Sequence, residues 1–226
     1  MGQGGWASHE LVRAVGQPAT VALRSAIPLE VDLDVVHAGD EVWHLVDPAA
    51  PDTIILEASR WEADYATTPA VSIDEAARAR EQFQITAETH PAPHCCSCGF
   101  HDASLNVHAG PLGDGRWATP FRVPSSLPDS QRHERSGIDE GLLWMAMDCA
   151  CGWYTSHDGG ERRGVTVQFA VSIYEEIELD TDYALVAWNG DYQPHWDGRK
   201  RGAAAALFNR TGDCVAQSRS FWVAPR

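Results

Sequence analysis

Basic residues are scarce in this chain. Lysine and arginine together number 17, against 32 aspartate and glutamate residues, and the formal net charge is −15. Proteins that bind nucleic acids need basic side chains to displace counterions from the phosphates, so this class of function is disfavoured. An anionic membrane surface would repel the chain for the same reason.

Long apolar runs and a leader sequence are missing as well. No stretch approaches the roughly 20 apolar residues that a membrane-spanning helix needs. The opening segment, Met1 to Trp6, lacks the basic and apolar regions of a signal peptide. We therefore expect a cytoplasmic protein with no membrane partner.

The chain has few cysteines, and their arrangement does not indicate a disulfide framework. Six are present, and Cys95 and Cys96 are adjacent, so we expect reduced thiols. Apolar residues are plentiful, in contrast, at 44% of the chain. A chain of 226 residues with this composition can form one large domain or two fused units of half that size.

A helix followed by antiparallel strands occurs twice, over 4–60 and over 138–223, which predicts a duplicated unit. We expect helices at 6–15 and 139–151. The expected strands are 20–25, 29–36, 41–46 and 53–60 in the first copy, then 105–109, 116–121, 165–173, 183–189, 201–209 and 214–223 in the second. The predicted divisions are an N-terminal half at 1–61, a connector at 62–104 and a C-terminal half at 105–226.

Two strands precede the helix of the second copy and none precedes that of the first. Either the connector supplies an opening strand to the first sheet or the natural start lies upstream. Within the connector, Ser72 and Glu75 form a capping-box pattern, which predicts a short helix over 73–82. Two prolines exclude a regular helix from the following run, His90 to Gly99.

Three segments resemble bacterial double-hotdog proteins of the acyl-CoA thioesterase type. They are Gly4-Gly5-Trp6 with the helix and the stretch 21–29 that follow, His90-Pro-Ala-Pro with Cys95-x-x-Cys98-Gly99, and the apolar helix over 142–153. The resemblance implies an α+β fold, a tandem (double) hotdog in which each half is a central helix wrapped by an antiparallel sheet. It also implies that acyl thioesters bind where the two helices meet the opposite sheet.

The chain departs from the best-known members of that family at the first helix. Gln3-Gly4-Gly5 stands where those members carry His-Gly-Gly. Hotdogs pair between chains in some members and within one chain in others, so a homodimer stays open here. The expected partner is an acyl-CoA or a similar thioester, and the chemistry requires no cofactor and no metal.

Asp148 is the candidate catalytic residue. It follows Leu142 to Met147, a run that is apolar on every helical face and therefore predicts a fully buried helix. Burial and the nearby helix C-terminus should both raise the pKa of this carboxyl group, which suits a base that activates water or a nucleophile that attacks the thioester. The alternative is a structural carboxylate that accepts a loop N–H or pairs with an arginine such as Arg163.

Gly4 and Gly5 are candidates for substrate binding, together with Trp6. Glycines at a helix N-terminus leave backbone N–H groups accessible, and these can stabilise the oxyanion of a thioester. Arg199 and Lys200 begin the one dense basic run and are candidates for the phosphates of coenzyme A. The alternative for the glycines is a flexible N-terminal tail. The alternative for the basic run is a solvated turn.

A rival hypothesis uses the cysteines as metal ligands. Cys95, Cys98, Cys149 and Cys151 could form a four-sulfur zinc site in a structural protein, with His90, His94 or His101 as alternative ligands. Side chains two residues apart on a helix diverge, so that set requires the helix to end near Cys149.

The leading interpretation is thioester hydrolysis at the interface of the two halves. The alternatives are a non-catalytic protein that binds acyl-CoA or another apolar ligand, and the zinc protein.

Overall fold

The computed structural model describes residues 2–60, 65–126, 138–157, 164–190 and 199–224. Within these ranges the helices are α1 (Gly4–Val15), α2 (Ile73–Arg80) and α3 (Glu140–His157). The strands are β1 (Ala19–Leu23), β2 (Asp34–Gly39), β3 (Val42–Asp47), β4 (Ala50–Arg60), β5 (Gly110–Pro111), β6 (Trp117–Phe121), β7 (Val165–Ile173), β8 (Tyr183–Trp188), β9 (Lys200–Phe208) and β10 (Cys214–Val223).

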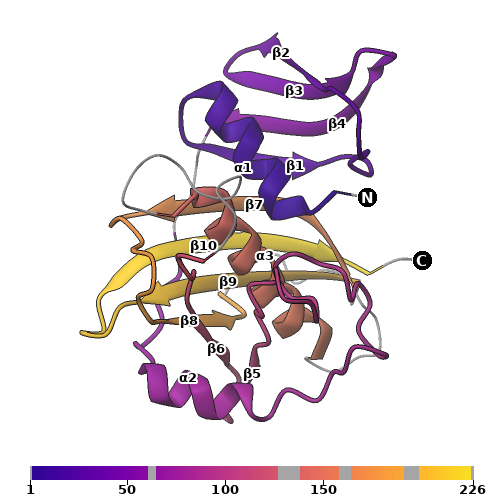
Figure 1. The fold of residues 1–226 in the computed structure, drawn as a ribbon. Helices are drawn as coiled ribbons and strands as arrows, with labels where there is room; N and C mark the ends of the chain where they lie inside the picture. The colour runs from indigo at the N-terminus through magenta and orange to yellow at the C-terminus, as the bar shows by residue number, and fades with distance from the viewer. Residues whose placement is uncertain (1, 61–64, 127–137, 158–163, 191–198, 225–226) are drawn as a thin grey trace.

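All the strands belong to one antiparallel sheet, in the order β2-β3-β4-β1-β7-β10-β9-β8-β6-β5. The N-terminal copy contributes the four strands at one end and the C-terminal copy the six at the other, as Figure 1 shows. The two copies join where β1 pairs with β7, with Val21 opposite Phe169 and Ala22 opposite Gln168. Both copies therefore share one sheet.

Helix α3 forms the centre of the larger core. Its residues Leu142 to Met147 are all at most 3% exposed, because the sheet of the C-terminal half curves around one side of the helix and a long loop covers the other. This burial confirms the helix that the apolar run predicts. Although α3 is long and largely apolar, no helix in the described part of the chain meets the length and hydropathy needed to span a membrane.

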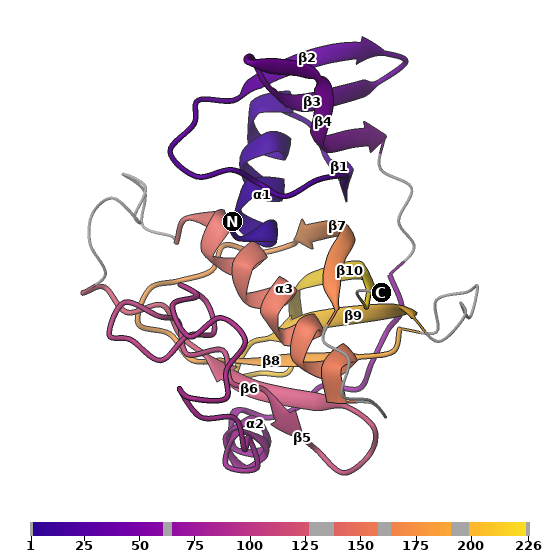
Figure 2. The same ribbon diagram turned by 90° about the vertical axis from the view of Figure 1, so that its right-hand side faces the viewer.

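Helix α1 fills a smaller core against the N-terminal strands. Leu11 packs there with apolar residues of β1 and β4, such as Val21 and Leu56. The N-terminal end of α1 also meets α3, as Figure 2 shows. The two central helices therefore contact each other at the junction of the halves.

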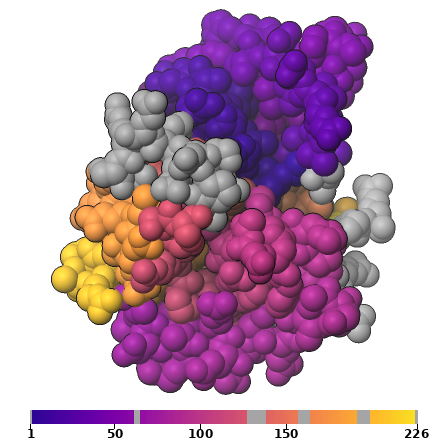
Figure 3. Space-filling view, viewed as in Figure 1, coloured from indigo at the N-terminus to yellow at the C-terminus, as the bar shows by residue number. Residues whose placement is uncertain are grey.

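The connector packs on the C-terminal half. Ser72 caps α2 through the predicted capping box with Glu75. Ala76 and Ala79 of α2 then pack on the face of β6 and β8 that lies away from α3. In the space-filling view the connector, in magenta, covers much of the C-terminal half (Figure 3). Among the described residues, the connector adds no strand to the N-terminal sheet.

Two of the predicted strands differ most from the structure. The predicted strand at 105–109 is wrong, because this segment is an irregular loop whose Val107 is buried against α3. The predicted strand at 29–36 is displaced, since β2 begins at Asp34. At 105–109 the alternating apolar residues follow a strand-like pattern but are buried by loop contacts, whereas at 29–36 the apolar residues Leu29 and Val31 are exposed in a loop.

The fold class is confirmed as α+β with a hotdog arrangement in each half, a central helix against an antiparallel sheet. The halves are unequal, since α1 has 12 residues and α3 has 18. The fold therefore brings together two helices of different length, and the shorter one presents its N-terminus to the longer.

Candidate functional site

Asp148 lies in the middle of α3, because the helix continues to His157 rather than ending at 151. The expected helix-dipole contribution at a C-terminus is therefore wrong. The expected burial is present, as Asp148 is only 5% exposed. A carboxylate inside an apolar core is costly unless hydrogen-bond donors surround it.

Three donors from two other parts of the fold surround this carboxylate. The backbone N–H of Gly5 donates to Oδ2 of Asp148 at 3.1 Å, and the side-chain amide of Gln3 donates to the same oxygen at 3.0 Å. The hydroxyl of Thr166, on β7, donates to Oδ1 at 2.6 Å. Asp148 therefore lies at the point where α1, α3 and the sheet meet.

Burial raises the pKa of Asp148 to about 6, against the usual 3.8, although the hydrogen bonds from Thr166, Gly5 and Gln3 lower it. Such a carboxylate is mostly ionised at neutral pH and can still accept a proton readily. This property suits a general base. The suggested arginine partner, Arg163, lies outside the described residues.

Gly5 allows the two helices to approach closely. A Cβ atom at this position would lie 2.5 Å from the carbonyl oxygen of Trp144 on α3. Any other residue would push α1 away from α3 and lengthen the bond from the N–H of Gly5 to Asp148. At Gly5, the close approach that glycine permits is therefore made by the backbone of α3.

Gln3 forms the N-cap of α1, and sequence reasoning did not assign it a role. Its side-chain oxygen accepts from the N–H of Trp6 at 2.6 Å while its amide nitrogen donates to Asp148. Gln3 thus caps α1 and contacts the carboxylate at the same time. Its position before two glycines at a helix start was the available signal.

Thr166 was also missed, because a bulge in β7 determines where it points. Gln168 pairs with Phe221 and Thr166 with Trp222, so Val167 has no partner opposite. Phe169 packs on Trp144 of α3, and regular alternation would place Thr166 on the other face of the sheet. The extra residue turns Thr166 toward the helix, which a sequence pattern does not reveal.

The other predicted binding residues lie around this point. Trp6 packs against the start of α3, where a Cβ on Gly141 would meet its ring at 2.8 Å. Arg199 donates to the carbonyl of Ala224 at 3.0 Å, next to the start of β9. In the sheet, Lys200 on β9 lies opposite Val223 on β10. Val223 in turn lies opposite the first residue of β7. The basic run therefore lies at the same end of the sheet as Thr166, about 10 Å across two strand spacings.

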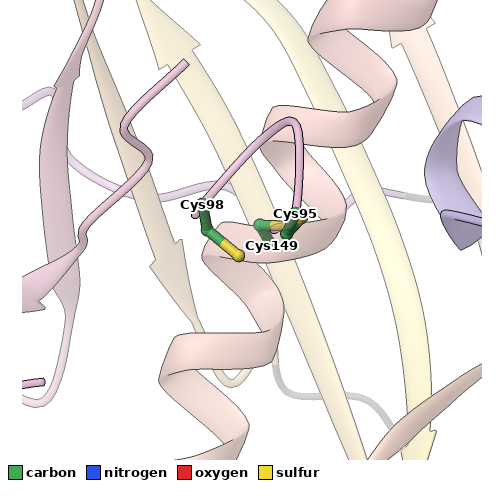
Figure 4. Close-up of side chains that lie close together, drawn as sticks. All are labelled: Cys95, Cys98 and Cys149. Atoms are coloured by element: carbon green, nitrogen blue, oxygen red, sulfur yellow. The ribbon is translucent and has the colours of Figure 1, made fainter. Parts of the chain in front are cut away.

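Three of the four predicted metal ligands come together. The Sγ atoms of Cys95, Cys98 and Cys149 all lie within 4.8 Å of one another. Figure 4 shows the three side chains, two from the loop and one from α3. Cys151 does not join them, because α3 continues past it and its sulfur lies 3.9 Å from Oγ of Ser218 on the sheet. The four-sulfur set is therefore wrong and a three-sulfur cluster replaces it.

These thiols interact with one another. Hydrogen bonding from the thiol of Cys149 lowers the pKa of Cys95 and raises the pKa of Cys149 itself. Burial raises the pKa of Cys151 to about 12. Burial therefore makes Cys151 a less reactive core thiol, whereas the pKa of Cys95 is shifted in the opposite direction.

A cavity of about 250 Å³ lies on the outer face of the sheet and does not reach Asp148. Its lining comprises Thr20, Ser59, Arg60, Gln168, Ala170, Arg219 and Phe221. On β10, Arg219 and Phe221 alternate with Ser218, which faces α3. The sheet therefore separates this cavity from the α1–α3 junction.

No protein-family model matches the sequence, and no curated protein matches it. Solved structures with a similar fold include the zebra fish thioesterase superfamily member 2, at 13% identity over 63% of this chain and 100% of that chain, with a TM-score of 0.47. A hypothetical thioesterase from Streptococcus pneumoniae, solved with coenzyme A, is 17% identical over 50% of this chain and 80% of that one, with a TM-score of 0.42. The E. coli PaaI protein of the phenylacetic acid degradation operon is 12% identical over 50% and 74%, also with a TM-score of 0.42.

Proposed function

We propose that the chain hydrolyses an acyl-CoA or a related thioester at the α1–α3 junction. The observation that carries this proposal is the buried carboxylate of Asp148 facing the glycine-rich N-terminus of α1, with 3.1 Å between Oδ2 and the N–H of Gly5. This arrangement places a base beside backbone donors. Acyl transfer to water requires both.

Asp148 acts on the water molecule. It takes a proton from water, whose oxygen attacks the thioester carbonyl carbon. The carbon–sulfur bond then breaks, the sulfur leaves as a thiolate that takes up a proton, and the products are a carboxylic acid and a thiol. No redox change and no cofactor enters this sequence.

The N-terminus of α1 stabilises the oxyanion that forms on the carbonyl oxygen. The N–H of Gly4 has no acceptor among the described residues, and that of Gly5 is bound to Asp148. When Asp148 accepts the proton it loses its charge and holds the N–H of Gly5 less strongly. That donor becomes available as negative charge develops on the substrate.

The proposed ligand contacts follow from the same placement. Arg199 and Lys200 lie at the sheet end where Thr166 reaches the carboxylate, so the phosphates of a coenzyme A can meet them while the thioester is at Asp148. Trp6 contributes apolar surface beside the junction. A free thioester without phosphates should therefore bind more weakly than its coenzyme A counterpart.

A panel of acyl-CoAs of increasing chain length, with detection of the released thiol, tests the proposal. We expect hydrolysis of at least one member by the wild type and loss of that activity in Asp148→Asn. Asp139→Asn is the matched control, because Asp139 is similarly buried and caps the same helix through the N–H of Gly141. Binding of acyl-CoA without hydrolysis of any member would replace this proposal with the non-catalytic one.

A further inference from the structure

A cluster of three thiols joins a long loop to α3, next to the proposed catalytic carboxylate. Cys95 and Cys98 come from the loop and Cys149 from the helix residue that follows Asp148. We propose that these three sulfurs bind one thiophilic divalent cation, Zn²⁺, which fixes the loop to the helix. The proposal does not depend on the hydrolytic function.

The spacing of the sulfurs fits a tetrahedral zinc ion. Zinc–thiolate bonds are about 2.3 Å long, so two thiolates on a tetrahedral ion lie about 3.8 Å apart. The Sγ atoms of Cys95 and Cys149 are 3.8 Å apart, and no pair in the cluster is more than 4.8 Å apart. Binding therefore needs a side-chain adjustment of about 1 Å or less.

The loop is shaped to direct two sulfurs to one point. The N–H of Gly99 donates to the carbonyl of Cys95 at 2.8 Å and closes the Cys-x-x-Cys turn. A Cβ at Gly99 would lie 2.5 Å from the carbonyl oxygens of both Cys95 and Pro93. Only glycine allows this turn to close so tightly, and Cys-x-x-Cys is an established spacing for zinc ligands.

The helix supplies the third sulfur from a fixed position. Ser97, within the turn, donates to the carbonyl of Met145 on α3 at 3.1 Å, so the loop already contacts the turn of helix before Cys149. In Figure 4 the side chains of Cys95 and Cys98 meet that of Cys149 from the loop. A helix, a closed turn and a hydrogen bond between them therefore position all three ligands.

Packing alone gives little reason for three thiols to converge. A thiol is a weak donor and a weak acceptor, so mutual contact stabilises the fold only slightly. The sulfur of Cys151, by contrast, lies toward the sheet. The three converging thiols are half-buried or buried, which shields a bound ion and still leaves it an access route.

The cluster lies next to the α1–α3 junction. The amide of Gln3, which donates to Asp148, also lies 3.9 Å from the sulfur of Cys149. Water is the expected fourth ligand there, as in sites that have three protein ligands. The ion thereby fixes the part of α3 that holds the carboxylate.

Metal content tests the proposal directly. The full chain is purified under reducing conditions, analysed for metals, and then titrated with Zn²⁺ and with Co²⁺ after chelation. We expect stoichiometric zinc, and with Co²⁺ a thiolate-to-metal charge-transfer band and the visible bands of a tetrahedral site. Cys149→Ser should lose both, while Cys151→Ser, altered two residues away on the same helix, should keep both.

Circular dichroism of each variant distinguishes lost binding from lost folding, and Cys95→Ser provides a second ligand substitution on the loop. Failure of the chelated wild type to bind either ion would overturn the proposal, as would equal loss of metal from Cys149→Ser and Cys151→Ser. A Cys95–Cys149 disulfide in freshly purified, metal-free protein would also overturn it. Asp148→Asn should retain the metal whatever its activity, so the two proposals fail separately.

Discussion

Asp148 combines a destabilising location with a complete set of donors. Its carboxylate is buried, and hydrogen bonds from Gly5, Gln3 and Thr166 offset part of the cost of burial. The effect of burial on the pKa of Asp148 is larger than that of the hydrogen bonds, since the pKa stays raised to about 6. A residue placed at a cost to stability is typical of functional sites.

Replacement of Asp148 by asparagine should therefore stabilise the fold at neutral pH. A pKa raised from 3.8 to about 6 corresponds to roughly 3 kcal/mol of unfolding free energy lost on ionisation, as an upper limit. Because the folded-state pKa is the higher one, the wild type is most stable below about pH 4 with respect to this group and loses stability as pH rises through 6. Asparagine keeps one oxygen for the N–H of Gly5, and the hydroxyl of Thr166 can rotate to accept.

Denaturant unfolding at pH 4 and at pH 8 checks this effect. Asp148→Asn should gain stability relative to the wild type at pH 8 and little or none at pH 4. A variant that is equally destabilised at both pH values would contradict this account and show that the carboxylate stabilises the fold.

Thr166 should affect the pKa of Asp148 more than the stability of the fold. Thr166→Val removes the 2.6 Å hydrogen bond that favours the ionised form, so the pKa of Asp148 should rise further. We expect the acidic limb of the pH–rate profile to move to higher pH and the rate at neutral pH to fall about two- to tenfold. Thr119→Val, which alters a buried threonine on β6, should leave the profile in place.

At the scale of elements, the site depends on how closely α1 approaches α3. Gly5→Ala should force the helices apart, because its Cβ would lie 2.5 Å from the carbonyl oxygen of Trp144. We expect a loss of about 1–3 kcal/mol in unfolding free energy and a large loss of activity. At Gly4 the nearest atom is the end of the Leu23 side chain at 3.0 Å, so Gly4→Ala should destabilise less. Equal effects of the two substitutions on stability would contradict this account of the interface.

Helices were easier to predict than the contacts between elements. The apolar run before Asp148 predicts a buried helix, and the Ser72–Glu75 pattern predicts α2, since both signals are local. The segment 105–109 shows the limit, because its alternation resembles a strand while the structure buries Val107 in a loop. Local pattern determines burial there but not backbone pairing.

The candidate site was predictable in part for the same reason. An acid in an apolar helix and glycines at a helix start are visible in the sequence, and the structure brings them together. The contribution of Thr166 depends on a bulge at Val167, and that of Gln3 on a contact across 145 positions of sequence. Both are consequences of tertiary structure and leave no periodic signal.

At the scale of the molecule, one sheet and one helix junction link the two halves. Phe169 lies at this joint, fully buried, opposite Val21 of β1 and against Trp144 of α3. Phe169→Ala should lower the free energy of unfolding by about 3–5 kcal/mol, measured by denaturant unfolding. Tyr174 lies just past the end of β7 and is 52% exposed. Tyr174→Ala should therefore lower the free energy of unfolding far less.

The two halves should also unfold together. Circular dichroism and tryptophan fluorescence should give coincident transitions in the wild type, because separating the halves would expose Phe169 and break the contact of α1 with α3. Two separated transitions would mean that the joint does not couple the halves.

The central claim is that Asp148 does the chemistry at the α1–α3 junction. Steady-state hydrolysis of the best acyl-CoA substrate by Asp148→Asn, measured beside the wild type, tests it most directly. The account predicts that kcat falls by about a hundredfold to ten-thousandfold, as expected when a general base is lost, while KM changes little. A kcat in Asp148→Asn equal to that of the wild type would contradict the claim.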